Sequence, residues 1–308
     1  DIADLGWVNF NGKIAGSSFN LDKIKTNIEG AIDSIEYRKY IYSHINTNGI
    51  LQKKAFDGAF KIKDPNINFI SNLEIDFKND IPSFNAVGDL INANFKELHF
   101  TDNPIQLTGV MDVNFKGNNI DNFAGTAKLF NGQLKGNSSK INFDSLTLSS
   151  TIEKGNKLIR IASDDLQASI KGKFDLVHLP ASVQYFIRNY LPTYIPSPKN
   201  NPTNQQFDIS IKTNYFEPYI RIFNPDFSGF NNVQLTGSLN TINQSINAKA
   251  NIPFAQWKEY TIRKGLIDAK GTKDSLFLQI NAASANLTDS FNLIQPNIRI
   301  NTSNDVSR

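Results

Sequence analysis

Apolar and polar residues alternate along most of this 308-residue chain. The alternation is clearest in FKIK (60–63), LEIDF (73–77), KINFD (140–144), FDISIKT (207–213) and LFLQINA (276–282). A period of two places the apolar side chains of a strand on one face and its polar side chains on the other. Strands with one dry and one wet face are typical of antiparallel sheets. The pattern therefore predicts an all-β fold.

Turn residues interrupt the alternation at short, regular intervals. Gly109, Gly117, Gly125 and Gly132 lie seven or eight residues apart, each beside Asn, Thr or Lys. Short strands with such punctuation indicate successive hairpins. No strict repeat of 20–50 residues is present, so the recurrence is structural. We expect a long, mostly antiparallel, curved sheet that forms an elongated groove (a repeating β-groove, or β-taco).

One stretch has the period of a helix. In HLPASVQYFIRNYLPTYIP, residues 178–196, Leu179, Val183 and Phe186 fall on one side at helical spacing. Pro180 suits the first helical turn, and Pro192 would end the helix. We expect one short amphipathic helix near 179–191. The residues of its apolar side that could cap the groove are Phe186, Ile187, Tyr190 and Leu191.

This helix divides the chain into segments. We expect a β-groove segment at 1–177, the helix at 178–196, a Pro- and Asn-rich loop at 197–206 and a continuing β-groove segment at 207–308. The helix could dock over an exposed sheet edge or the end of a core, which blocks edge pairing. Alternatively, it could gate the groove or contact lipid.

The composition argues against several classes of protein. The chain is 40% hydrophobic and has no cysteine, and its net charge of +3 comes from scattered residues of both signs. No basic stripe suggests a nucleic-acid partner, and no apolar run is long enough for a membrane-spanning helix. The first residues lack the features of a signal peptide, and the last lack a finishing element. These features suggest an internal fragment of a longer protein.

The sequence offers little for catalysis or metal binding. His44, His99 and His178 are isolated, and no recognised catalytic or nucleotide-binding motif is present. We therefore expect no enzyme activity, no cofactor and no metal site.

Three stretches, at 35–77, 89–100 and 159–192, carry structural motifs in a fixed order. The first contains Y-x-x-Y-x-Y, formed by Tyr37, Tyr40 and Tyr42, and then DGAFKIKDPN at 57–66. The third ends in LPASVQYFIRNYLP. Together they resemble the periplasmic repeat region of TamB-like translocation and assembly proteins, relatives of the AsmA family, in the form found in Bacteroidota. The resemblance covers about residues 5–230.

The resemblance implies a location and partners. Members of the family are anchored in the inner membrane by a helix, have a long periplasmic β-body with an apolar groove, and meet an outer-membrane partner related to barrel-assembly proteins. They are implicated in moving phospholipid between the two membranes and in assembling outer-membrane proteins. This chain would then be a soluble slice of the body, located in the periplasm. Phospholipid or another acyl-chain amphipath would be its partner, and the outer-membrane protein would bind through parts outside this chain.

Physical reasoning favours the same function. Exposing a lipid with about 30 methylenes to water costs on the order of 25 kcal/mol, so a continuous apolar trough would make the crossing feasible. The apolar members of the strongest alternating strands are the candidate lining residues: Phe60, Ile62, Ile75, Phe77, Phe95, Val113, Phe115, Leu129, Ile141, Phe143, Leu146, Leu148, Ile209, Ile211, Leu276, Leu278 and Ile280. Alternatively, they form a closed core. Tyr37, Tyr40 and Tyr42 could lie at a groove rim or pack across strands.

Two other functions stay open. The chain could be a structural or interaction protein, such as an adhesin or a chaperone-like platform that offers sheet edges. It could also be a carbohydrate-binding β-solenoid, although only Trp7 and Trp257 could provide indole platforms. An apolar trough open to solvent would favour lipid, whereas a dry, closed core would favour a scaffold or adhesin.

Overall fold

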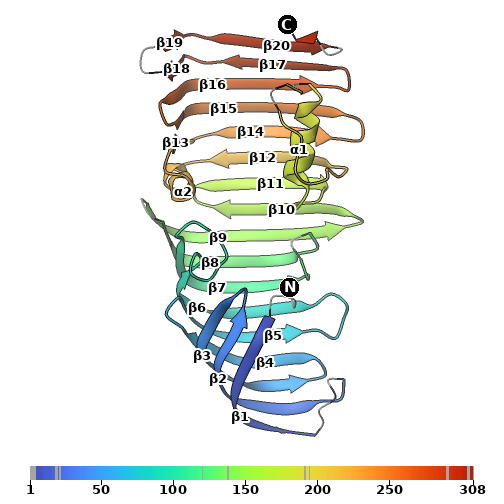
Figure 1. The fold of residues 1–308 in the computed structure, drawn as a ribbon, viewed down its shortest axis with the longest axis vertical. Helices are drawn as coiled ribbons and strands as arrows, with labels where there is room; N and C mark the ends of the chain where they lie inside the picture. The colour runs from blue at the N-terminus through green and yellow to red at the C-terminus, as the bar shows by residue number, and fades with distance from the viewer. Residues whose placement is uncertain are drawn as a thin grey trace. The chain divides into compact units, whose positions relative to one another are not determined.

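The computed structural model describes residues 5–17, 20, 22–119, 121–136, 139–190, 192–193, 195–288, 291–303 and 306–307. It is an all-β chain of antiparallel meanders with two short helices, so the predicted fold class is confirmed. Two compact units are present: unit 1 comprises 1–118 and 122–148, and unit 2 comprises 119–121 and 149–308. Figure 1 labels their elements. The predicted segments with boundaries at 177, 196 and 206 stay a prediction.

Unit 1 is an antiparallel meander in which each strand pairs with the next along the chain. Its strands are β1 (Leu5–Gly16), β2 (Lys25–Tyr37), β3 (Tyr40–Gln52), β4 (Ala55–Lys63), β5 (Ile67–Asp76), β6 (Ser83–Asn94), β7 (Gln106–Lys116) and β8 (Ala124–Lys135). Strand β9 (Lys140–Glu153) has residues in both units.

Strand β3 has two halves with different neighbours. Residues 45–52 pair with both β2 and β4, whereas residues 40–43 pair with β2 alone. At the junction His44 has a φ of 52°, a left-handed conformation that interrupts the extended strand. Beyond it the hairpin leaves β4 and crosses in front of the unit (Figure 1). Tyr40 and Tyr42 pack there against a buried cluster on β6 and the segment that follows it.

The carboxylate of Asp64 holds this crossing hairpin in place. Asp64 follows β4 and is 7% exposed. It accepts hydrogen bonds from the Tyr40 hydroxyl, from the Ser43 amide at 3.0 Å and hydroxyl at 2.8 Å, and from the Asn66 amide at 2.9 Å. The Asn66 side chain donates in turn to the Tyr40 oxygen at 3.1 Å. The tyrosine strand and the DPN turn, noted separately in the sequence, thus form one hydrogen-bonded network.

Unit 2 continues as an antiparallel meander with local branches. Its strands are β10 (Asn156–Ser163), β11 (Leu166–Lys173), β12 (Gln206–Thr213), β13 (Phe227–Gly229), β14 (Gln234–Asn240), β15 (Ser245–Trp257), β16 (Tyr260–Gly271), β17 (Ser275–Asn281), β18 (Ser284–Thr288), β19 (Phe291–Ile294), β20 (Asn297–Ser303) and β21 (Val306–Ser307). The helices α1 (Leu179–Arg188) and α2 (Glu217–Phe223) lie at opposite ends of these strands (Figure 1).

Helix α1 is the helix that the sequence predicted. Pro180 lies in its first turn, and it ends at Arg188, four residues before Pro192. Its apolar side packs on the face of the sheet, where Phe186 joins Phe174, Phe207 and Leu239 in a buried cluster. The helix therefore covers a sheet face instead of the sheet edge that was one of the expected positions.

Helix α2 was not predicted from the sequence, which indicated strands after residue 207. The Asn231 side chain accepts hydrogen bonds from the backbone amides of Phe216 and Glu217, at 2.7 and 2.8 Å, and so satisfies the helix N-terminus. The Tyr219 hydroxyl donates to Asp165. These tertiary partners stabilise a helix too short to be stable alone.

The Asp64 network generates a pH prediction. Partial burial alone would raise the pKa of Asp64, but the hydrogen bonds from Tyr40, Asn66 and Ser43 outweigh it and lower the pKa below its usual value. A lowered folded-state pKa contributes stability above the unfolded pKa of about 4 and loses it as the pH falls through the folded value. We expect Asp64→Asn to reduce the free energy of unfolding by about 1–3 kcal/mol at pH 7, and by less below pH 4.

Urea unfolding at several pH values would measure this difference. Asp57→Asn, at an exposed position of β4, is the matched control and should change stability by less than about 0.5 kcal/mol. A constant difference between the wild type and Asp64→Asn from pH 7 to pH 3 would contradict the assigned role of the carboxylate.

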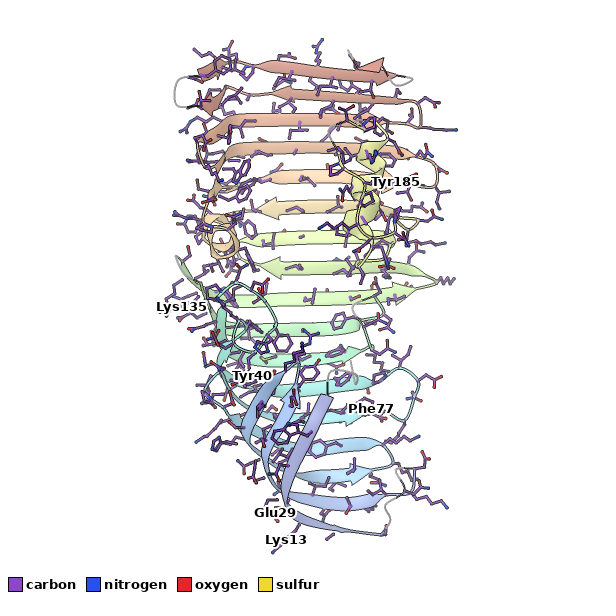
Figure 2. The ribbon with its side chains drawn as sticks, viewed as in Figure 1. Lys13, Glu29, Tyr40, Phe77, Lys135 and Tyr185 are labelled. Atoms are coloured by element: carbon purple, nitrogen blue, oxygen red, sulfur yellow. The ribbon has the colours of Figure 1, made fainter. Side chains whose placement is uncertain are left out.

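The packing of α1 generates a second prediction. Phe186 is 3% exposed, whereas its neighbour Tyr185 is 50% exposed and lies on the outward side of the helix (Figure 2). We expect Phe186→Ala to reduce the free energy of unfolding by about 3–5 kcal/mol, because it removes a buried aromatic ring. Tyr185→Ala, the control on the same helix, should cost less than about 1 kcal/mol. Similar losses in the two variants would show that α1 is not anchored through its apolar side.

Candidate apolar binding site

In unit 1 the strand register places six predicted lining residues on one face of the sheet. Residues that pair across antiparallel strands have their side chains on the same face. One row runs from Phe60 through Ser71, Gly88 and Met111 to Leu129. Parallel rows on the same face contain the predicted residues Ile62, Ile75, Val113 and Phe115.

Part of this face lines an apolar cavity of about 420 Å³. Its walls come from β5 to β9 and from residues 95–100. The lining residues are Ile67, Phe69, Leu90, Ala93, Phe95, Leu98, Phe100, Leu107, Met111, Val113, Ala127, Lys128, Leu129, Leu146 and Leu148. Among these described residues Lys128 alone is polar, and strand alternation directs its side chain to the opposite face from Ala127 and Leu129. The cavity therefore presents an almost wholly apolar surface.

Residues 95–100, FKELHF, close one side of the cavity. The segment folds into a compact turn in which the Leu98 amide donates to the Asn94 carbonyl and the Phe100 amide donates to the Phe95 carbonyl. Leu98 is only 1% exposed. The Phe95 and Phe100 rings meet edge to face at 6.2 Å. The turn thus places three apolar side chains over the sheet without adding a strand.

The hairpin of β2 and β3 supports this turn from outside. The Arg38 carbonyl lies 2.9 Å from Nδ1 of His99, and the Arg38 guanidinium lies 5.1 Å from the centre of the Phe100 ring. Tyr40 and Tyr42 meet edge to face at 4.8 Å, and burial raises the pKa of both, that of Tyr40 to about 12. Figure 2 shows Tyr40 on this hairpin. The tyrosines therefore buttress the wall by packing and hydrogen bonding, and they do not line the cavity.

The other predicted residues of unit 1 lie outside the cavity. Ile62, Ile141 and Phe143 are buried in the core, and the Phe143 ring lies so close to Gly132 that a Cβ there would meet it at 2.2 Å. Phe115 belongs instead to an aromatic group in which Phe84 stacks on Phe115 at 4.8 Å and meets Phe77 edge to face at 5.9 Å. Phe60 and Ile75 are half-buried on the same face.

A larger hollow in unit 1, of about 840 Å³, has a mixed lining of apolar and polar residues, including four charged ones. Lys13, Glu29, Lys61 and Asp89 contribute to its lining, and strand alternation places them on the face opposite the apolar rows. Figure 2 labels Lys13 and Glu29. The hollow is therefore less suited to an acyl chain than the cavity of about 420 Å³.

In unit 2 the predicted residues also share one face. Ile209 is linked through Gly237, Ala248 and Ala269 to Leu278. A neighbouring row runs from Ile211 to Ile280, and a third runs from Phe207 to Leu276. Helix α1 covers part of this face, since Phe207, Leu239 and Ile246 pack with it.

The helix residues proposed to cap a groove have different positions. Phe186 is buried, and Tyr190 packs against the same cluster, with burial raising the pKa of its hydroxyl, which donates to the Thr272 carbonyl. Ile187 is half-buried outside the cluster. Leu191 lies outside the described residues.

Sequence reasoning missed several residues that build these sites. Leu98 and Phe100 lie in a turn with no strand period, and Leu90 and Met111 were not among the predicted lining residues although they alternate correctly. Gln205, in the predicted loop, is fully buried; it accepts from the Asp175 amide at 3.0 Å and donates to Thr203 Oγ1 at 2.6 Å. The only sequence signal for the burial of Gln205 was its position just before the predicted strand at 207–213.

The histidines have separate partners. His44 contacts Ser43, His99 contacts Arg38, and His178 lies 2.9 Å from Asp175 just before α1. The described part of the chain brings no three His, Asp or Glu side chains together in a metal-binding arrangement. Within that same part, neither helix has the length and apolar character needed to cross a bilayer.

Comparisons with known proteins give no relative from which a function could be transferred. No family model matches the chain, and neither a curated protein nor a solved structure is significantly similar to it.

Proposed function

We propose that this chain binds the acyl chain of a phospholipid or a similar amphipath, and that unit 1 provides the binding site. The observation that supports the proposal is the cavity of about 420 Å³ whose lining is apolar except for Lys128. Small-molecule sites commonly have volumes of about 300–1,000 Å³ and mostly apolar walls, but they add a few polar groups that fix orientation. A lining without such groups favours a ligand portion that makes no hydrogen bonds.

Energetics set the expected affinity. Each methylene removed from water contributes about 0.8 kcal/mol, so ten buried methylenes would contribute about 8 kcal/mol before the cost of ordering the chain. The corresponding dissociation constant is about 1 µM at best. Such moderate binding suits a carrier, because a tightly held acyl chain would leave too slowly to be passed on.

The apolar rows of unit 2 support a second contact surface for lipid. Ile209, Ile211, Leu278 and Ile280 are half-buried, and of these four Ile209 alone packs against the buried cluster at α1. A surface that touches an acyl chain along many similar side chains holds it without fixing one position. We propose that it makes weaker contact with acyl chains than the cavity of unit 1.

The wider proposal places this activity in the bacterial envelope. The three stretches that resemble TamB-like proteins support a periplasmic scaffold that carries phospholipid between the membranes, assists assembly of outer-membrane proteins, or does both. An outer-membrane partner would bind through parts outside this chain. The alternative function, a structural or chaperone-like β platform without lipid, is favoured if the cavity binds no acyl chain.

Filling the cavity tests the proposal. Ala127 lines the cavity, and Thr126 on the same strand pairs with Asn114 on the opposite face. We expect Ala127→Phe to weaken binding of a fluorescent fatty acid about tenfold or more, because the new ring occupies the space of several methylenes. Thr126→Phe, which adds the same ring outside the cavity, should bind like the wild type. Fluorescence titration would measure both, with thermal unfolding as the check on folding.

Mass spectrometry under native conditions provides a test that needs no variant. Wild-type chain purified from a bacterial envelope should retain lipid, and organic extraction should identify it. A lipid-free wild-type chain that also fails to bind the fluorescent fatty acid at concentrations near 100 µM would refute the proposal and favour the structural alternative.

A further inference from the structure

Phe100 marks the place where the cavity of about 420 Å³ in unit 1 opens to solvent. It is 46% exposed, whereas the other described lining residues are buried or half-buried. The ring is held in place, because the Phe100 amide donates to the Phe95 carbonyl and the two rings meet edge to face. A ligand whose acyl chain fills the cavity would therefore have its head group near the Phe100 ring.

The tip of the β2–β3 hairpin places a guanidinium beside this opening. Arg38 and Lys39 form the two-residue turn between Tyr37 and Tyr40, and their φ angles are 51° and 62°. Two central residues with positive φ are the mark of a type I′ turn, whose twist matches that of the flanking strands. The Arg38 guanidinium lies 5.1 Å from the centre of the Phe100 ring and 5.7 Å from that of the Tyr37 ring.

A backbone contact ties the same turn to the wall of the cavity. The Arg38 carbonyl lies 2.9 Å from Nδ1 of His99, and this nitrogen is the donor because a carbonyl oxygen only accepts. Arg38 is thus positioned near Phe100 through its backbone as well as through its side chain. A donor that is already positioned loses less freedom when a ligand binds. The planar guanidinium also matches the geometry of a carboxylate or a phosphate, to which it can donate two hydrogen bonds.

The charge around the opening is mixed. Four other exposed charged residues, two of each sign, lie in the two turns and just after them: Lys39, Lys96, Glu97 and Asp102. Glu36 of β2 lies on the face of the hairpin opposite to Tyr37, because successive side chains of a strand alternate. These charges largely offset one another, so an anionic group would be recognised through direct contact with Arg38 and not through a broad positive field.

We propose that Arg38 binds the anionic head group, a carboxylate or a phosphate, of the amphipath whose acyl chain occupies the cavity of unit 1. This inference rests on the acyl-chain binding proposed above and adds the chemistry of the head group to it. The lining itself offers no polar group to the ligand, since the one polar residue, Lys128, is directed to the opposite face. The partner of the head group must therefore lie outside the lining, and Arg38 lies at the opening.

Two ligands of equal chain length separate the head group from the acyl chain. Dodecanoate carries a carboxylate and dodecanol is uncharged, and both can be titrated by displacement of the uncharged fluorescent probe N-phenylnaphthylamine. We expect Arg38→Gln to weaken dodecanoate binding about five- to tenfold at low ionic strength, because a charge-assisted hydrogen bond is lost. Dodecanol binding should change by less than about twofold. Lys53→Gln, which removes an exposed positive charge just after the other end of β3, should leave both affinities unchanged.

Further ligands identify the source of the anion. Lysophosphatidylglycerol, which carries a phosphate and a single acyl chain, should lose affinity in Arg38→Gln as dodecanoate does. Inorganic phosphate alone should not compete with dodecanoate at matched ionic strength. Competition by phosphate would reveal an anion site that is independent of the acyl chain, and it would overturn the inference.

The remaining outcomes distinguish this inference from the proposed function. Equal losses of dodecanoate and dodecanol binding in Arg38→Gln would overturn the inference, since they would give Arg38 a structural role only. If the wild type bound dodecanol and Arg38→Gln still bound dodecanoate normally, the assignment of the head group would be wrong while acyl-chain binding would stand. A wild-type chain that bound neither ligand would refute both.

Discussion

The structure depends on one constraint: each strand has a single apolar face, and that face must be shielded from water. The two units meet the constraint in different ways. In unit 1 the chain covers itself, because residues 40–44 leave β4 and residues 95–100 fold over β6. In unit 2 the short helix α1 lies on the sheet face and buries Phe207 and Leu239. Neither cover spans the whole face, so apolar surface stays accessible in both units.

Polar contacts decide where each cover sits, because apolar packing alone does not fix a register. In unit 1 the carboxylate of Asp64 takes four hydrogen bonds and ties the tyrosine hairpin to the turn after β4. In unit 2 the buried Gln205 connects the start of β12 to the segment before α1. A misplaced cover would leave these buried groups unpaired, which is more costly than losing a few apolar contacts.

The sequence contained enough to predict the local elements but not their covers. Alternation gave the strands and the shared face of Phe60, Val113 and Leu129, because a strand's side-chain period is a local property. Helix α1 could be predicted for the same reason, because the helical period of its apolar residues is also a local property. Helix α2 and the turn at 95–100 were missed, since both have partners far away in the sequence, Asp165 for α2 and Arg38 for the turn. Such distant contacts also decide which apolar residues line a cavity and which, like Phe143, pack in the core.

The cavity in unit 1 has a different consequence for each of the two proposed functions. A hollow of about 420 Å³ lined by apolar side chains leaves those side chains without the contacts that a filled core would supply, and this lowers stability. A single replacement of Ala93 or Ala127 by a larger apolar residue would fill part of the space and reduce this cost. Both positions nevertheless hold alanine. Under the function proposed above, a bound acyl chain would supply the missing contacts, whereas a purely structural protein would carry this cost with no ligand to offset it.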